Sequence, residues 1–141
     1  MVFSELKDLI LFQMPGRYKD TLPPDPVLRL MVHRALKRIA KDTVPLRLVV
    51  NDPSQITIIR KLDNETYIRF PLPPFRDDDD IDCDEELAEA VAAHVCSEIE
   101  PQRKGHYLQQ YEREILQNNE RLIETELDIC TTLSYREQPW L

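Results

Sequence analysis

The stretch from Arg76 to Val91 reads RDDDDIDCDEELAEAV and is the most acidic part of the chain. Before it, the proline-rich residues 70–75 (FPLPPF) end a β-rich segment, because proline cannot donate the backbone hydrogen bond that a sheet requires. After it, apolar residues recur at helical spacing. The acidic run therefore marks the junction between a β part and a helical part of the fold.

The helix after the acidic run is predicted over residues 84–100. We expect Asp82 or Asp84 to cap it, with Glu85 and Glu86 in the first turn, where carboxylates meet the positive end of the helix dipole. Its apolar side is formed by Leu87, Ala90, Val91, His94, Val95 and Ile99.

A calcium loop is the alternative interpretation of the same run. Asp78, Asp80, Asp82 and Asp84 alternate, and Glu89 follows at the spacing of the last ligand of an EF-hand. However, Cys83 stands where that loop needs glycine for its sharp turn, and a proline-rich segment replaces the entering helix. Capping and surface charge explain the run better, so we expect no bound metal and no cofactor.

Three further helices follow from caps and apolar spacing. The first covers about residues 4–12, with Ser4 as its cap, and the second runs from Asp25–Pro26 to about Lys41. The last is long, about residues 104–130, with a seven-residue repeat of Leu108, Ile115, Leu122 and Ile129. Polar Asn118 and Thr125 at intervening positions favour a helix packed against its neighbours over a coiled coil.

The β-rich part lies at about residues 44–70. VPLRLVV (44–50) alternates apolar and polar residues, and two more β-rich runs flank Asp63–Asn64, a pair that tolerates a tight turn. With that loop, Ile59 faces Ile68 and Thr57 faces Phe70. The predicted fold class is α+β, mainly α: one helical domain over residues 1–130 with an inserted antiparallel β-hairpin or meander, and a tail over residues 131–141.

Composition and motifs exclude several classes of function. The chain has 141 residues and a net charge of −8, which disfavours binding to nucleic-acid phosphates. Only two glycines are present, too few for a phosphate-binding loop or a dinucleotide fold. His33, His94 and His106 belong to no catalytic or zinc motif, so we expect no enzyme.

The setting of the protein is predicted from what the sequence lacks. The N-terminus has no basic leader, so we expect no secretion. No segment approaches the roughly 18 apolar residues of a membrane span. Cys83, Cys96 and Cys130 form no CxxC pair and are expected to stay reduced, as in a cytosolic setting.

Charge is segregated along the chain. Residues 26–47 carry six Arg or Lys against one Asp, whereas residues 77–100 carry eleven Asp or Glu and no Lys or Arg. The two segments pair either within one chain or between identical subunits, head to tail. The candidate interface residues are Arg34, Lys37, Arg38 and Lys41 on the basic side, and Asp78, Asp79 and Asp80 on the acidic side.

The order of the elements resembles a known family. YIRFPLPP (67–74), the aspartate run, IDCDEELAEAVAAHVCSEI (81–99) and a long polar helix with a short tail follow one another. This order resembles small structural proteins of tailed bacteriophages, of the head-to-tail adaptor or neck type. The resemblance covers roughly residues 55–130, and the N-terminal helix pair has no counterpart in it.

The resemblance implies a structural virion protein, made in the host cytoplasm, that forms a homo-oligomeric ring beneath the portal protein. It would contact the portal and tail or neck proteins, with viral DNA only in passage and no membrane. The hairpin and the tail would reach its partners, with Tyr67, Arg69, Tyr135 and Trp140 as contact residues. The alternative is a small cytosolic accessory or regulatory protein that docks one partner through its hairpin and tail.

Overall fold

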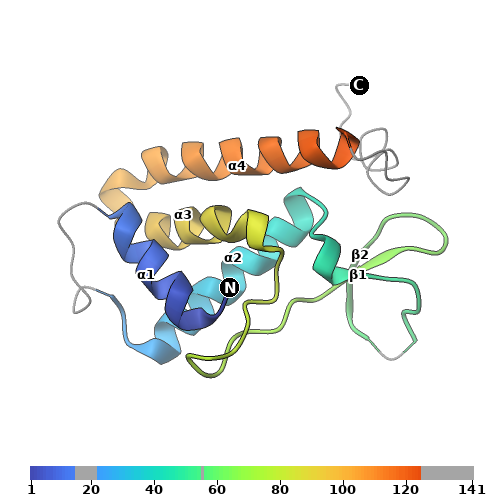
Figure 1. The fold of residues 1–141 in the computed structure, drawn as a ribbon, viewed down its shortest axis with the longest axis horizontal. Helices are drawn as coiled ribbons and strands as arrows, with labels where there is room; N and C mark the ends of the chain where they lie inside the picture. Colours follow the sequence, from blue (N-terminus) through green and yellow to red (C-terminus); the bar gives the residue numbers. More distant parts are fainter. Residues whose placement is uncertain (15–21, 55, 125–141) are drawn as a thin grey trace.

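The computed structural model describes residues 1–14, 22–54 and 56–124. Over these residues the chain forms four α-helices, three short 3-10 turns and a small three-stranded antiparallel sheet at one side (Figure 1). The predicted α+β, mainly α class with an inserted β-hairpin is therefore confirmed.

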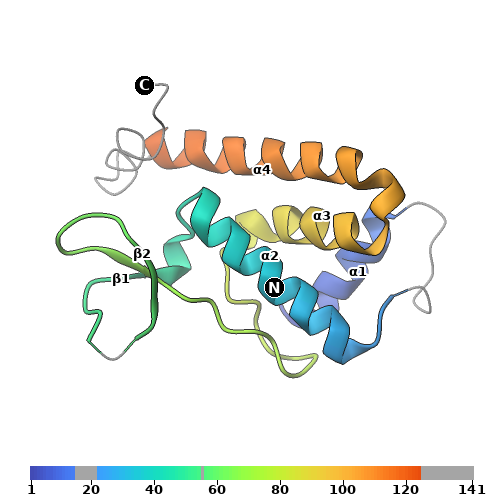
Figure 2. The same ribbon diagram turned by 180° about the vertical axis from the view of Figure 1, so that it is seen from behind.

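Helix α3 (Ala88–Ile99) is the centre of the helical part. Helix α4 (Lys104–Glu124) runs along one side of it, and α1 (Phe3–Gln13) and α2 (Asp25–Asp42) pack on the other, as Figures 1 and 2 show. The sequence explains the central position of α3, because its small alanine side chains let three neighbouring helices approach closely. Its buried residues are Ala88, Ala90, Val91, Ala92, Ala93, Val95, Cys96 and Ser97.

The buried side of α4 follows a helical period, as predicted, and the helix packs against α3. Tyr107 takes the most buried place in the first turns, where Leu108 was expected, and polar Asn118 is also buried. The remaining buried residues are Tyr111, Ile115 and Leu122. Residues 125–130 of the predicted helix lie outside the described residues.

The helix caps differ from the expected ones. Val2 precedes α1, so the predicted cap Ser4 lies inside the helix, and the carboxylate of Glu5 accepts a hydrogen bond from the Val2 backbone nitrogen at 3.1 Å. Helix α2 begins at Asp25 with Pro24 at the cap position, one residue from the predicted start.

The sheet is a hairpin with an added strand, rather than a meander. Strand β3 (Tyr67–Arg69) lies between β1 (Val49–Val50) and β2 (Ile58–Lys61). The predicted register holds where the Phe70 backbone nitrogen donates to the Thr57 carbonyl oxygen at 2.9 Å. It then slips by one residue at an irregularity between Ile58 and Arg60, so that Arg60 and not Ile59 lies opposite Ile68.

Residues 46–48 form a 3-10 turn where the alternating pattern predicted a strand. The apolar residue Leu48 of this segment is nevertheless buried. It belongs to a second core cluster that joins the sheet to the ends of α2 and α4. That cluster consists of Ala40, Val44, Leu48, Leu62, Ile68 and Leu122.

Candidate interaction surface

The backbone of the acidic run pairs with the N-terminus of α1. The backbone nitrogens of Phe3 and Ser4 donate to the carbonyl oxygens of Asp79 and Asp77 at 2.9 and 3.0 Å. Val2 and Asp80 form an isolated antiparallel bridge. The run thereby satisfies the first N–H groups of α1 and places its carboxylates near the positive end of that helix.

Asp82 is the one buried carboxylate of the run (residues 77–84) and is surrounded by donors. Its oxygens accept two hydrogen bonds from the guanidinium of Arg69, at 2.5 and 2.7 Å, and one from Arg47 at 3.2 Å. The Leu72 backbone nitrogen donates a further bond at 2.8 Å. Burial acts to raise the pKa of Asp82, but the bonds from Arg69 and Leu72 and the two positive charges outweigh it, so the pKa is lowered.

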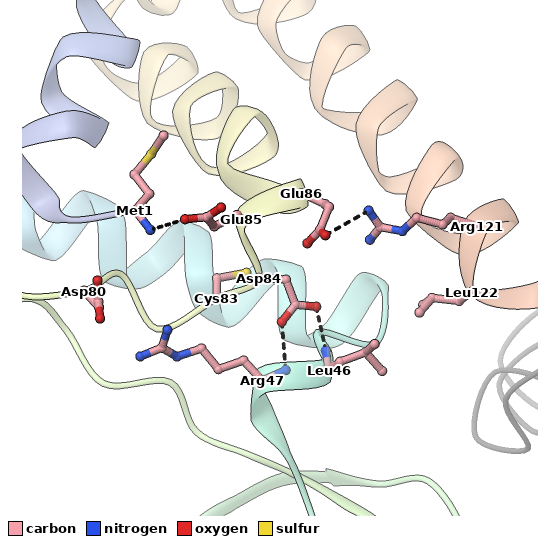
Figure 3. A pocket seen from close by; sticks show the side chains of 10 residues that line it. All are labelled: Met1, Leu46, Arg47, Asp80, Cys83, Asp84, Glu85, Glu86, Arg121 and Leu122. Carbon is pink, nitrogen blue, oxygen red and sulfur yellow. Dashed lines mark hydrogen bonds and ion pairs between the residues drawn. The ribbon is translucent and has the colours of Figure 1, made fainter. Parts of the chain in front are cut away.

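Asp84 binds the 3-10 turn instead of capping its own helix. Its two carboxylate oxygens accept the backbone N–H groups of Leu46 at 2.7 Å and Arg47 at 2.8 Å, as Figure 3 shows. The residue stands at the N-cap position of the turn Glu85–Leu87, but its side chain makes no capping bond there. The predicted capping role of Asp82 and Asp84 is therefore wrong, because both carboxylates are used by the β part. Glu85 and Glu86 lie in the 3-10 turn that precedes α3 and not in the first turn of the helix, because α3 begins at Ala88 rather than near residue 84.

An open pocket of about 800 Å³ lies beside Asp84. Figure 3 shows Arg121 and Leu122 from the end of α4 on one wall and Leu46 and Arg47 on another. Cys83 also lines it, but burial, together with the charge of Asp84, raises the pKa of that thiol to about 12. A thiol with such a pKa stays protonated at neutral pH and is a poor nucleophile.

The other aspartates of the run differ in their roles. Asp79 accepts the backbone N–H groups of Phe75 and Arg76, both at 2.9 Å, and these bonds lower its pKa. Asp78 has a side chain that is 82% exposed, and its one ion pair among the described residues is a long contact of 3.8 Å with Arg76. Asp80 is exposed and makes no ion pair with the described part of the chain.

The four alternating aspartates do not converge on one point. Asp82 is turned to Arg69, and Asp84 is turned to the backbone of residues 46–47. Among residues 1–14, 22–54 and 56–124, no group of three or more His, Cys, Asp or Glu side chains is placed to hold a metal ion. These side chains are therefore not arranged as the ligands of a calcium loop.

The predicted basic residues of α2 differ in whether they form an ion pair within the chain. Arg34 is paired with Glu98 of α3, and Arg38 binds Asp42 at 2.8 Å. Lys37 and Lys41 make no ion pair with any residue that the structure describes. Part of the basic surface is therefore used within the chain, and pairing between identical subunits stays a prediction.

A polar network joins α2, α3 and α4 beneath this surface. The Tyr111 hydroxyl donates to Asp42 at 2.7 Å, and the Tyr111 ring makes an edge contact with His94. His94 Nδ1 lies 3.6 Å from Glu98, beyond hydrogen-bond distance. Burial lowers the pKa of His94, with Arg38 and Arg34 adding to the effect and Glu98 opposing it. His94 is thus a packed, neutral residue of the helix interface, as the apolar spacing indicated.

The predicted hairpin contacts have local partners. The Tyr67 hydroxyl donates to the Asn64 carbonyl oxygen at 3.3 Å, and Arg69 is bound to Asp82. Their part in a partner contact stays a prediction. Tyr135 and Trp140 lie outside the described residues.

Sequence reasoning missed one surface, the proline strap, which we define as residues 70–76. Pro71 and Pro74 are buried, whereas Leu72 and Phe75 are 65% and 66% exposed. From the sequence alone, these prolines indicate only the end of the sheet. The signal is present in the sequence, because in FPLPPF the two buried prolines are three residues apart and so are the two most exposed apolar residues.

No match decides the family. The chain matches no protein-family model, no curated protein and no solved structure. None of the helices in the described part of the chain is long and apolar enough to cross a membrane. The functional argument therefore rests on the geometry of these surfaces.

Proposed function

We propose that this protein is a structural subunit that assembles with copies of itself, head to tail, and that it serves as a head-to-tail adaptor or neck component of a tailed bacteriophage. The observation that carries the self-assembly is charge that remains exposed after the internal pairs have formed. The exposed residues concerned are Lys41 on α2 and Asp78 and Asp80 on the acidic run, and the half-buried Lys37 adds a second positive charge on α2.

The two charged surfaces belong to different parts of the molecule. Lys41 lies at the C-terminal end of α2, whereas the backbone of Asp80 is bridged to Val2 before α1. Opposite charges on separate surfaces favour contact between identical subunits through two different faces, and such a contact forms a ring when its rotation closes. Exposed charge pairs each contribute only ~0.2–1 kcal/mol, so they guide register more than they hold the subunits together.

Charge reversal tests the self-assembly. We expect Lys37→Glu/Lys41→Glu to weaken oligomers in sedimentation velocity, more at low salt than at high salt, because exposed charges are screened. Adding Asp78→Lys/Asp80→Lys in the same chain should restore assembly. Lys104→Glu, on an exposed residue at the start of α4, is the matched control and should assemble like the wild type.

Unchanged assembly of the α2 variant at every ionic strength contradicts the proposal. A wild-type chain that stays a monomer or forms only a simple dimer favours the alternative, a cytosolic accessory protein that docks one partner. The virion assignment is tested separately by the flanking genes, where portal, terminase or tail genes are expected.

A further inference from the structure

We propose that the proline strap of one copy docks on the outer side of helix α2 of a second copy, with Leu72 and Phe75 as the apolar centre of the contact. The inference rests on the proposed self-assembly and adds what the charged residues lack, namely an apolar anchor. Exposed charges steer an association, but buried apolar and aromatic side chains supply most of the binding free energy.

The strap presents its two apolar side chains on a rigid support. Proline fixes its own φ angle, and a residue that precedes proline is held in an extended conformation. Leu72 and Phe75 are three residues apart and exposed, whereas Pro71 and Pro74, also three apart, are buried; this pattern fits the three-residue turn of a polyproline segment.

Hydrogen bonds anchor the strap to the body at both of its ends. His33 Nε2 lies 2.9 Å from the Pro71 carbonyl oxygen, and the Leu72 nitrogen donates to Asp82 at 2.8 Å. Arg29 donates to the Phe75 carbonyl oxygen at 2.5 Å, and the Phe75 nitrogen donates to Asp79 at 2.9 Å. A surface held in this way loses little conformational entropy when a partner binds.

The outer side of α2 has the matching character. Its residues are spaced by three or four positions, which places them on one side of the helix, opposite the buried side. At the N-terminal end of this side, Val27 and Leu30 are 43% and 59% exposed. Towards the C-terminal end the residues are basic: Arg34, which is paired with Glu98 of its own chain, and then Lys37 and Lys41, which have no ion pair within the described residues.

Charge complementarity identifies the occupant as a second copy of this chain. The strap has an apolar pair followed by the exposed carboxylates of the acidic run, and α2 has an apolar pair followed by basic residues. Apart from the exposed Arg76 at the end of the strap, the charges beside the two apolar areas are opposite in sign, negative beside the strap and positive along α2. An apolar centre with complementary charges around it is the usual composition of a protein interface.

A mixing experiment tests the contact. The strap variant is Leu72→Ser/Phe75→Ser, and the α2 variant is Val27→Ser/Leu30→Ser. We expect each variant alone to assemble at least tenfold more weakly than the wild type in sedimentation velocity. An equimolar mixture should form a one-to-one complex and nothing larger, because only one intact strap and one intact α2 surface can meet.

The control replaces equally exposed apolar residues elsewhere. Phe12→Ser/Leu116→Ser changes one Phe and one Leu on α1 and α4 and should assemble like the wild type. Circular dichroism and melting temperature confirm that each variant is folded, which is expected because all the replaced side chains are exposed.

The possible failures separate this inference from the proposed function. If the strap variant assembles like the wild type, or if the mixture stays monomeric, the strap contact is overturned. If the strap variant assembles and Lys37→Glu/Lys41→Glu does not, head-to-tail assembly through charge survives without the strap. A wild-type chain that stops at two copies but depends on the strap supports the contact and contradicts a ring. A wild-type chain that is monomeric at all concentrations overturns both.

Discussion

Asp82 illustrates how one residue joins the two parts of the fold. It lies just before the turn that leads into α3, yet its partners are Arg69 in β3, Arg47 in the 3-10 turn and the backbone of Leu72 in the strap. A capping aspartate would stabilise one helix end. Asp82 instead neutralises two arginines and positions the strap.

We predict that Asp82→Asn lowers the free energy of unfolding by about 3 kcal/mol, because it removes one partner of a buried ion pair and leaves Arg69 without its counter-charge. Urea denaturation at pH 7 measures this. Asp78→Asn is the matched control, since its side chain is exposed, and its effect should stay within about 0.5 kcal/mol. Equal costs for the two variants would contradict the assigned role of Asp82.

The same pair of proteins gives a prediction for pH. The pKa of Asp82 is lowered in the folded state, so its stabilisation is fully present above the unfolded-state pKa of about 3.9 and is lost as pH falls through the folded-state pKa. The difference in unfolding free energy between wild type and Asp82→Asn should thus be constant from about pH 7 to pH 5 and shrink below about pH 4. A difference that shrinks already between pH 7 and pH 5 would point to a histidine instead.

At the scale of elements, a buried polar contact positions α4 against the end of α2. Asn118 Nδ2 donates to the Thr43 hydroxyl at 3.0 Å, and that hydroxyl donates to Asn119. Arg121 donates to the carbonyl oxygen of the Asn118 side chain. Asn118 thus breaks the apolar side of α4 and sets the register of the helix against residue 43.

We predict that Thr43→Val costs about 1–3 kcal/mol of unfolding free energy, because the buried Asn118 amide loses its acceptor while the shape of residue 43 is kept. Adding Asn118→Leu should recover part of the loss, since the stranded polar group is then removed. Thermal or urea denaturation of the two single variants and the double variant measures the coupling. Thr57→Val, on an exposed threonine, is the control. Costs that simply add would show that the two side chains do not interact.

At the scale of the whole molecule, self-assembly predicts a change at the C-terminal tail. Trp140 is the only tryptophan, so its fluorescence reports on this tail alone. We expect red-shifted emission in the isolated subunit and blue-shifted emission on assembly, because tryptophan is a frequent anchor of protein interfaces. The Val27→Ser/Leu30→Ser variant controls for concentration and should show no shift. Blue-shifted emission already in the dilute monomer would indicate that Trp140 completes the core of its own subunit.

The sequence alone determined the helices and the sides that they bury. Apolar spacing is a local property of the sequence. It located the buried sides of α2 and α3 and predicted the long helix α4. The reason is that burial of one side contributes most of the free energy that stabilises such helices. The sequence also predicted the hairpin, including the pairing of Thr57 with Phe70. Beyond Ile58 the register differs from the predicted one by one residue, because a one-residue bulge leaves no mark in the apolar pattern of the sequence.

The tertiary structure decided how the charges are used. Asp82 and Asp84 carry the same local signal as capping residues, but packing brings Arg69 and the backbone of residues 46–47 to them, 13 to 38 residues away in the chain. The same holds for Arg34, which meets Glu98, and for Leu72 and Phe75, whose exposure depends on which side of the strap faces the body. Ion pairs and exposed apolar residues are relations between distant segments, so only the folded arrangement separates the charges used within the subunit from those left for a partner.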